Sequence, residues 1–494
     1  MLQGKLTTMV ATQYPTKANW VALSKLTYGF TPQDLTRINN SGFKSWLDKQ
    51  LSPTLSEGPS SISKLSGFMT LTATIDEVSK FSIFDKNDDL PGDELVAITI
   101  IRRLFSERQL FEMLVEHFND YVHVPLHTAW QSRVSFDRDV IRANTLGNYP
   151  DMLMASSVHP SMLDYLNGNE NTKEAPNENY GRELQELHTV TSKAGYLQSD
   201  VVDAARAFSG TYWDYDKNIL VVDPDQHWMG KLSVFGWTHA NTNADPAEIL
   251  KMTRSLIHYL AMKPETAKAF STRLARRFVA DDPSPALIAR MSAKYLTTGG
   301  NIPAVMRSMT SSRDFLTNAG KKVKRPMEHF ASVVRNLDLK FAAPIQPGDA
   351  NTPDNYFHDS VMQNIDDYLV AQGHEPMAWP FPNGYPDIAT PWTTLNGQIR
   401  RWNNGAALSH GWNDQDFLRP DFESLLKGVA AKPGDVVDSL SMRLLGTKLS
   451  PADRNDIVKV VSDSYDSSTS LPPLSQYGQT ASTLLIAMPI WNFR

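Results

Sequence analysis

The stretch DELVAITIIRRLFSERQLFEMLVEHFNDY, residues 93–121, decides the fold class of this chain. Its apolar residues recur at the spacing of an α-helix, about 100° per residue, and not at the two-residue period of a strand. The following residues fall within one narrow arc of that projection: Ile100, Leu104, Phe111, Val115 and Phe118. The stretch therefore predicts one long helix with a buried apolar face, and Glu112, Glu116 and Asn119 share a different face.

Helical periodicity returns throughout the chain. Clear segments are 245–262, 264–279 and 284–296, and several begin with Ser, Asp or an early Pro, as helices do. The main strand signal is NILVVD, residues 218–223, which predicts half of a small hairpin after TYWDYDK. We expect a mainly α fold: a large multi-helix, bundle-like protein with a small β-hairpin insertion and long ordered loops. Strands should hold less than about a tenth of the residues.

Length and composition narrow the class of protein further. With 494 residues the chain should contain two or more packed subdomains. A Pro- and Gly-rich stretch at 337–355 predicts a boundary between a main helical domain, residues 1–336, and a C-terminal helical region, residues 337–494, packed on the first. The net charge of −6 is spread along the chain and argues against a nucleic-acid-binding protein. The absence of cysteine excludes disulfides and thiolate chemistry.

No stretch approaches the ~18–20 apolar residues that span a bilayer. Residues 1–20 also lack the apolar run of a signal peptide. Two locations therefore stay open: the cytoplasm, or the periplasm or extracellular space if a leader has been removed. If the protein is exported, we expect an apolar segment to be encoded upstream of Met1.

The densest polar stretch is NENYGRELQELHT, residues 177–189. On a regular helix, Arg182, Glu183 and Glu186 would share one polar arc, with leucines opposite and His188 pointing elsewhere. One interpretation is a structural network in which Arg182 is buried between carboxylates, so that its loss would cost ~3–5 kcal/mol. The other interpretations are a metal or acid–base site and a solvated face.

If the protein is an enzyme, this stretch is its candidate active site. The candidate catalytic residues are Arg182, Glu183, Glu186 and His188. A divalent metal would be held by Glu183, Glu186, His188 and the loop residue His227, so we expect these side chains to converge. Candidate substrate-binding residues are Asn179, Arg206 and Lys231. The end of the long helix carries Glu112, Glu116 and Asn119. These side chains either contribute to this site or form the solvent-exposed side of the helix.

Motifs of the common enzyme classes are missing from the sequence. It has no Gly-rich phosphate loop, no G-x-S-x-G elbow, no H-E-x-x-H pair and no EF-hand loop. Serine hydrolase, kinase, NTPase and Rossmann functions therefore have no support.

Several of these segments, in this order, resemble a bacterial family known as domain of unknown function 1800. The resemblance rests on NENYGRELQELHT, on GYLQSDVVDAARAFSG at 195–210, on DQHWMGK at 225–231 and on FPNGYPDIATPW at 381–392. The family pattern falls on Asn177, Glu178, Asn179, Arg182, Glu183, Glu186 and His188, followed by Asp200, Arg206, His227 and Lys231. Many relatives carry an Asn-His pair at the end of the long helix, where this chain has Asp120.

The resemblance implies a setting but no activity. Many relatives look exported and are encoded beside sulfatase-like proteins, which suggests a sulfatase-like partner and a role in envelope or extracellular polymer metabolism. Two functions stay open: a metal-dependent enzyme with a buried carboxylate and histidine site, or a non-catalytic binding or assembly protein whose polar cluster only braces helices.

Overall fold

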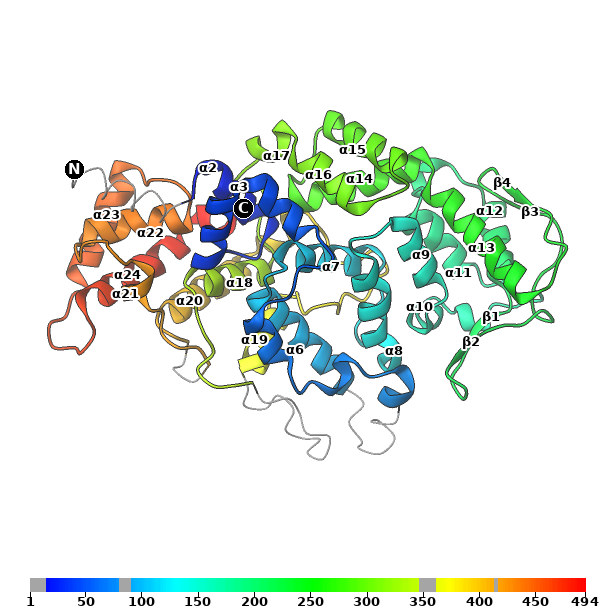
Figure 1. Ribbon diagram of the computed structural model, residues 1–494, viewed down its shortest axis with the longest axis horizontal. Helices are drawn as coiled ribbons and strands as arrows, with labels where there is room; N and C mark the ends of the chain where they lie inside the picture. Colours follow the sequence, from blue (N-terminus) through cyan, green and yellow to red (C-terminus); the bar gives the residue numbers. More distant parts are fainter. Residues whose placement is uncertain (1–14, 80–89, 346–360, 413–415) are drawn as a thin grey trace.

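Helices form nearly all of the regular structure in the computed structural model, which describes residues 15–79, 90–345, 361–412 and 416–494 (Figure 1). The first group of helices is α2 Lys17–Leu26, α3 Pro32–Gln50, α4 Pro59–Leu65, α6 Leu90–Phe105, α7 Gln109–Tyr121, α8 Trp130–Ser135, α9 Tyr149–Ser157, α10 Pro160–Tyr165, α11 Glu178–Glu183 and α12 Gln198–Phe208. The second is α13 Pro246–Ala261, α14 Pro264–Phe278, α15 Pro285–Thr297, α16 Ile302–Thr310, α17 Arg313–Thr317 and α18 Pro326–Asn336. The third is α19 Val361–Val370, α20 Leu395–Ser409, α21 Phe422–Leu425, α22 Pro433–Leu444, α23 Pro451–Asp463 and α24 Pro473–Ala487.

Short 3₁₀ and π turns complete the helical structure. The 3₁₀ turns are η1 Met69–Leu71, η3 Gly168–Glu170, η5 Ser192–Ala194, η6 Thr390–Trp392 and η7 Pro489–Asn492. The π turns are η2 Phe136–Arg142 and η4 Leu184–His188.

Strands are confined, among the described residues, to two small antiparallel hairpins. The first pairs β1 Thr211–Asp214 with β2 Ile219–Val222, which confirms the hairpin predicted from NILVVD. The second, β3 Leu232–Val234 with β4 Trp237–His239, was not predicted because its strands have only three residues each. The mainly α fold is confirmed.

The long helix predicted over residues 93–121 is two helices, α6 and α7. Ser106 interrupts it: its hydroxyl accepts a hydrogen bond from the Arg108 amide (3.1 Å), and the Gln109 side chain donates to the carbonyl groups of Arg103 (3.2 Å) and Ser106 (2.9 Å). These bonds satisfy the last carbonyls of α6 and let the chain change direction. As a result α7 is buried on every side, from Gln109 to Tyr121, so the interpretation of Glu112, Glu116 and Asn119 as a wet face was wrong.

Helix α7 lies in the middle of the molecule (Figure 1). The C-terminal helices α20 to α24 lie at one end, whereas α9 to α13 and the hairpins lie at the other (Figure 1). The parts of the chain before and after residue 337 contact each other. Helix α18 packs on α20, and the Arg494 side chain donates to the Lys25 carbonyl (2.9 Å). The predicted domain boundary stays a prediction, and residues 346–355 of that stretch lie outside the described residues.

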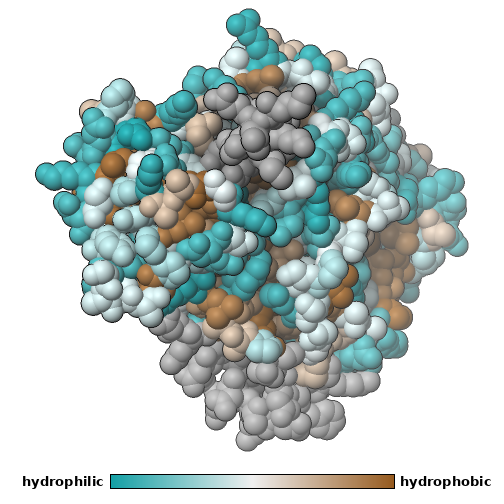
Figure 2. All heavy atoms as spheres, turned by 60° about the vertical axis from the view of Figure 1, so that its left-hand side comes forward, coloured by the Kyte–Doolittle hydropathy of each residue, from teal (hydrophilic) through white to brown (hydrophobic). Residues whose placement is uncertain are grey.

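The surface around the C-terminal helices is mainly hydrophilic, with hydrophobic residues in small scattered groups (Figure 2). Such scattered apolar groups are usual on a folded protein. Among the described residues, no helix is long and apolar enough to cross a membrane.

A close approach of two helices explains the glycine in the NENYGRE motif. Helix α11 packs on α12 at Gly181, where an added Cβ would lie 2.9 Å from the Val201 carbonyl oxygen and 3.0 Å from the Ala205 amide nitrogen. Both obstacles are backbone atoms of a packed helix, so neither can move away cheaply. The motif therefore has a packing role as well as a polar one.

We expect Gly181→Ala to lower the free energy of unfolding by about 1–3 kcal/mol, because the added methyl group overpacks this contact. The sign is the reverse of the usual gain of roughly 0.5–1 kcal/mol for Gly to Ala within a helix. Gly92→Ala is the matched control, since the nearest atom to its added Cβ lies at 3.9 Å. Denaturant unfolding of both variants checks the prediction, and equal stability of the two would contradict it.

Candidate functional site

The NENYGRELQELHT motif begins as a regular helix and ends as a π turn. The Asn177 side chain caps α11 by accepting a hydrogen bond from the Asn179 amide (3.0 Å). From Leu184 to His188 the turn widens to the π form, with the Thr189 hydroxyl donating to the Leu184 carbonyl (2.6 Å). A π turn holds more residues than an α turn, so the regular projection fails after Leu184.

Arg182 is not buried, and the prediction of a buried Arg182 was wrong. Its side chain is 40% exposed and donates to Glu178 (2.9 Å) and Gln198 (3.0 Å) on the surface. Leu184 and His188 occupy the buried side of the motif instead. Arg182 therefore forms an ordinary surface ion pair with Glu178, which lies four residues earlier on the same helix.

Glu183 and Glu186 lie half-buried and near each other. Burial raises the pKa of Glu183, the neighbouring Glu186 carboxylate raises it further, and Arg182 opposes both effects. Glu186 accepts a hydrogen bond from the Tyr196 hydroxyl (3.2 Å). Neither glutamate forms an ion pair among the described residues.

The two histidines of the predicted metal site lie in surroundings different from those of the two glutamates. His188 is fully buried, and burial together with Arg273 and His123 lowers its pKa to about 3. Its Nε2 atom has no hydrogen-bond partner. His227 uses both ring nitrogens structurally, with Nδ1 2.8 Å from the Ser209 carbonyl oxygen and Nε2 3.3 Å from Asn241 Oδ1.

The predicted metal ligands Glu183, Glu186, His188 and His227 do not form a metal site. In the part of the chain that the structure describes, no group of three or more His, Asp or Glu side chains could hold a metal ion. The physical reason lies in the motif itself: the π turn directs His188 into the core while the glutamates stay near the surface. A divalent metal therefore does not fit these residues.

The predicted substrate-binding residues are not joined to the glutamates by any hydrogen bond or ion pair in the described structure. Arg206 pairs with Asp203 (2.9 Å) and lies 4.8 Å from the centre of the Trp228 ring. Lys231 is exposed and Asn179 is half-buried in the first turn of α11. On α12, Asp203 and Asp200 accept amide hydrogen bonds from the second hairpin, so this region holds the hairpin in place.

The largest concentration of buried charge lies instead where α7, α14 and α18 meet. Glu116 on α7 pairs with Arg277 on α14, which also contacts Glu328 on α18 at 2.8 Å. Arg103 lies 3.4 Å from Glu116, and the Tyr28 hydroxyl donates to the same carboxylate (2.8 Å). Burial alone would raise the pKa of Glu116, but the surrounding arginines hold it well below its usual range.

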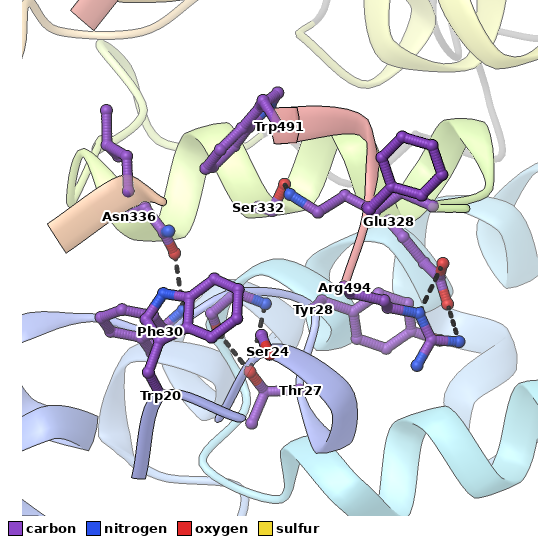
Figure 3. Close-up of a pocket in the computed structure, with 14 residues that line it drawn as sticks. Trp20, Ser24, Thr27, Tyr28, Phe30, Glu328, Ser332, Asn336, Trp491 and Arg494 are labelled. Atoms are coloured by element: carbon purple, nitrogen blue, oxygen red, sulfur yellow. Dashed lines mark hydrogen bonds and ion pairs between the residues drawn. The ribbon is translucent and has the colours of Figure 1, made fainter. Parts of the chain in front are cut away.

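Two further arginines extend this buried charge network. Arg325 donates to Asp120 (2.6 Å) and forms an ion pair with Asp387 (2.8 Å). Arg494 reaches Glu328 (3.0 Å), with the Phe30 amide bonded to Asn336 close by (Figure 3). The cavity drawn there holds about 20 Å³, enough for a water molecule but not for a substrate.

On the other side of the network lies a larger pocket of about 260 Å³. It is lined by the end of α7, by α14 and by the segment from Trp379 to Ile388: His117, Asp120, Tyr121, Arg273, Arg276, Trp379, Asn383, Gly384, Tyr385, Pro386, Asp387 and Ile388. We call it the α7–α14 pocket. Asp120 and Asp387 belong both to the pocket wall and to the network, so the network fixes the pocket's shape.

The Trp379–Ile388 segment is held tightly against the end of α7. Gly384 has a left-handed backbone (φ 65°), and a Cβ there would collide with the Asp120 backbone. The next amide, that of Tyr385, donates to Asp120 Oδ1 (3.3 Å). Only glycine can occupy this position without strain, which gives NGYPD a defined structural role.

The family model described as "Protein of unknown function (DUF1800)" matches residues 21–493, which include every element around this pocket. The chain belongs to the DUF1800 family. No curated protein and no solved structure matches it.

Two half-buried arginines bring positive charge to the α7–α14 pocket. The Arg273 guanidinium lies 4.3 Å from the centre of the Tyr121 ring, and Arg276 donates from Nε to the Asp281 carbonyl (3.0 Å). Neither forms an ion pair with a carboxylate among the described residues. Their charges are therefore available to a ligand.

Two titratable groups in the pocket have strongly shifted pKa values. Burial lowers the pKa of His117 to about 3, so its imidazole is neutral, and its buried Nε2 has no hydrogen-bond partner. Burial raises the pKa of Asp120 to about 6; Arg325 opposes this shift, and Glu116 adds to it. An unpartnered buried nitrogen in a pocket wall is costly unless a ligand or water satisfies it.

The NENYGRELQELHT motif borders this pocket without lining it. The Tyr165 hydroxyl donates to the Pro380 carbonyl (3.2 Å), and burial and then Glu183 raise the pKa of Tyr165. Arg273, which lines the pocket, lowers the pKa of His188. Of the predicted site residues, His188 and Glu183 thus come near the pocket.

We expect Arg277→Ala to cost about 3–5 kcal/mol of stability, because it leaves Glu116 and Glu328 as buried charges without their shared partner. Arg182→Ala removes the same side chain from an exposed pair and should cost no more than about 0.5 kcal/mol. Thermal and denaturant unfolding of the two variants give the comparison. If both variants melt at the temperature of the parent protein, the ion pairs of Arg277 do not stabilise the fold.

Proposed function

We propose that the α7–α14 pocket binds one acidic sugar unit of an envelope or extracellular polymer. The observation that supports this most directly is the pair Arg273 and Arg276, which bring two positive charges without carboxylate partners to a pocket with aromatic walls. Arginine presents a planar fork of donors that matches a carboxylate or sulfate group. An anionic substituent is therefore the first feature of the ligand.

The aromatic walls supply the second feature. The rings of Trp379 and Tyr385 lie 5.2 Å apart at an angle of 50°, and Tyr121 lies across the pocket beside Arg273. A sugar ring presents apolar C–H faces that pack on aromatic rings while its hydroxyls bond to groups such as the Asn383 amide. The volume of about 260 Å³ lies just below the roughly 300–1,000 Å³ usual for ligand pockets, so the pocket can hold at most a single sugar unit.

His117 supplies a neutral hydrogen-bonding group to the pocket wall. Its buried Nε2 has no hydrogen-bond partner among the described residues, so a ligand hydroxyl that reaches it can form a hydrogen bond with it. Burial lowers the pKa of His117 to about 3; Asp387 opposes this shift, but Arg277 and Arg273 add to it, so the imidazole is a weak base near neutral pH. The proposed function is therefore ligand binding, and no proton transfer and no metal step is assigned.

The alternative is a non-catalytic assembly protein in which the polar residues only brace helices. The buried network around Glu116 and Arg277 favours a bracing role for those residues. It leaves Arg273, Arg276 and the free Nε2 of His117 unexplained, and ligand binding accounts for all three. A sulfatase-like partner, suggested by the family resemblance, would act on the same class of acidic polymer.

We expect galacturonate to bind the protein and galactose to bind far more weakly, as measured by calorimetry. Arg273→Ala should weaken galacturonate binding roughly 10- to 100-fold, since a charge-assisted hydrogen bond contributes about 1.5–3 kcal/mol. Arg290→Ala is a charge-matched control, because Arg290 is exposed, lies outside the pocket and donates, within the described part of the chain, to Ser308 and Ser311. Equal binding of the two sugars, or an equal effect of the two variants, would refute the proposal.

The affinity for galacturonate should rise severalfold as the pH falls from about 7 to about 5. Asp120 has a pKa of about 6, so it loses its negative charge over this interval and stops repelling the ligand, whose own carboxylate stays ionised. His117, with a pKa of about 3, stays neutral throughout. Asp120→Asn should bind at pH 7 as the parent does at pH 5, and a pH-independent affinity in the parent protein would contradict this assignment.

A further inference from the structure

A second cavity, of about 640 Å³, lies between α9 and α13 and shares no lining residue with the α7–α14 pocket. Its walls come from the first turns of α9, from Trp237 at the second hairpin and from one face of α13: Pro150, Asp151, Met154, Trp237, Lys251, Arg254, Ser255, His258, Tyr259, Met262 and Lys263. We call it the α13 groove.

Basic side chains run along one wall of this groove. Lys251, Arg254 and His258 are exposed at successive turns of α13, and Lys263 follows just after the helix ends. At 1.5 Å per residue, Lys251 and Lys263 are about 18 Å apart along the helix direction. A row of this length suits a ligand with several charges in line better than a single small anion.

Carboxylates neutralise only part of this row. Lys251 lies 3.4 Å from Glu248, at the limit of a useful ion pair. Arg254 has no ion pair among the described residues, and the Lys263 amine donates to the Tyr259 hydroxyl (2.9 Å). Asp151 is the one carboxylate that lines the groove among the residues that the structure describes, and the basic side chains outnumber it.

The floor of the groove is apolar and comes from Pro150, Met154, Met262 and Trp237. The Trp237 ring lines the groove and is held in place by a hydrogen bond from its nitrogen to Ser255 (3.3 Å). A ligand that suits this surface has negative groups on one side and an apolar face on the other. Linked acidic sugar rings have this character.

One buried aromatic layer connects the groove to the α7–α14 pocket. Tyr121 of the pocket stacks on Tyr149 at 5.2 Å, and Tyr149 contacts Phe270 at 5.0 Å. Pro150, the next residue after Tyr149, lines the groove. The two cavities therefore lie on the same rigid part of the molecule.

We infer that the α13 groove is a second binding site, which holds a stretch of an acidic polysaccharide through Lys251, Arg254, His258 and Lys263. The choice of a polysaccharide over an acidic peptide rests on the function proposed for the α7–α14 pocket. The groove holds the chain and the pocket receives one unit. Because the contacts are electrostatic and partly exposed, binding weakens as salt rises.

The test compares an oligomer of galacturonate with the monosaccharide at constant pH. The double variant Lys251→Glu/Arg254→Glu changes two exposed side chains, so the fold should be kept, as circular dichroism can verify. We expect it to weaken oligomer binding about tenfold or more and to leave monosaccharide binding unchanged. The control is Lys268→Glu/Lys294→Glu, which reverses two exposed charges outside both cavities and should leave oligomer binding unaltered.

The outcomes separate this inference from the proposed function. Loss of oligomer binding in the groove variant, with no monosaccharide binding in the parent protein, would support the groove and refute the pocket proposal. If the groove variant, the control variant and the parent protein bind the oligomer with equal affinity, the groove inference is overturned. This holds whether or not the monosaccharide binds to the pocket. Tighter groove-dependent binding of polyglutamate than of the galacturonate oligomer also overturns it, because the groove would then be a peptide site.

Discussion

The burial of Arg277 constrains the rest of this structure. Its guanidinium has no exposure and must be neutralised by Glu116 from α7 and Glu328 from α18. A buried charge without partners costs several kcal/mol, so the positions of α7, α14 and α18 depend on one another. Arg494 then reaches Glu328 from the far end of the sequence, and residues more than 350 positions apart become parts of one electrostatic unit.

The same unit creates the α7–α14 pocket. Arg273 and Arg277 are four residues apart on α14, yet Arg277 points into the network and Arg273 lies in the pocket wall. Asp387 is bound by Arg325 and Arg277, so the segment from Trp379 to Ile388 is anchored by the network at one end and by Gly384 against Asp120 in the middle. This part of the pocket wall has no regular helix, yet buried ion pairs and a close backbone contact hold it in place. Preorganisation of this kind lowers the cost of binding a ligand.

Local patterns in the sequence predicted the fold well. Periodicity gave the helices now seen as α13, α14 and α15, and NILVVD gave the first hairpin. The break at Ser106 was missed because it depends on side-chain bonds from Gln109, which periodicity does not contain.

The site was harder to predict, for a physical reason. The buried partners of Glu116 come from α6, from α14, from Arg325 just before α18 and from His374, and no local pattern links such distant positions. NENYGRELQELHT attracted attention because its charges are adjacent in sequence, but adjacency favours surface pairs such as that of Arg182 with Glu178. The useful signals were the acidic residue Asp120, near the end of the stretch that decides the fold, and the segment FPNGYPDIATPW, whose Tyr385 amide donates to Asp120 Oδ1.

Asp120 and Asp387 show how one network can combine a fixed and a variable charge. Both form ion pairs with Arg325, and burial by itself would raise the pKa of each. Asp387 has Arg277 and Lys322 as additional cations, so its pKa falls well below the usual range. Asp120 has Glu116 and Asp387 as additional anions, so its pKa rises to about 6. Near neutral pH Asp387 therefore stays ionised and paired with both arginines, while Asp120 gains or loses a proton and changes the charge of the pocket by one. Because Asp120 is itself a partner of Arg325, its protonation weakens that one ion pair, whereas the ion pairs of Glu116, Glu328 and Asp387 remain.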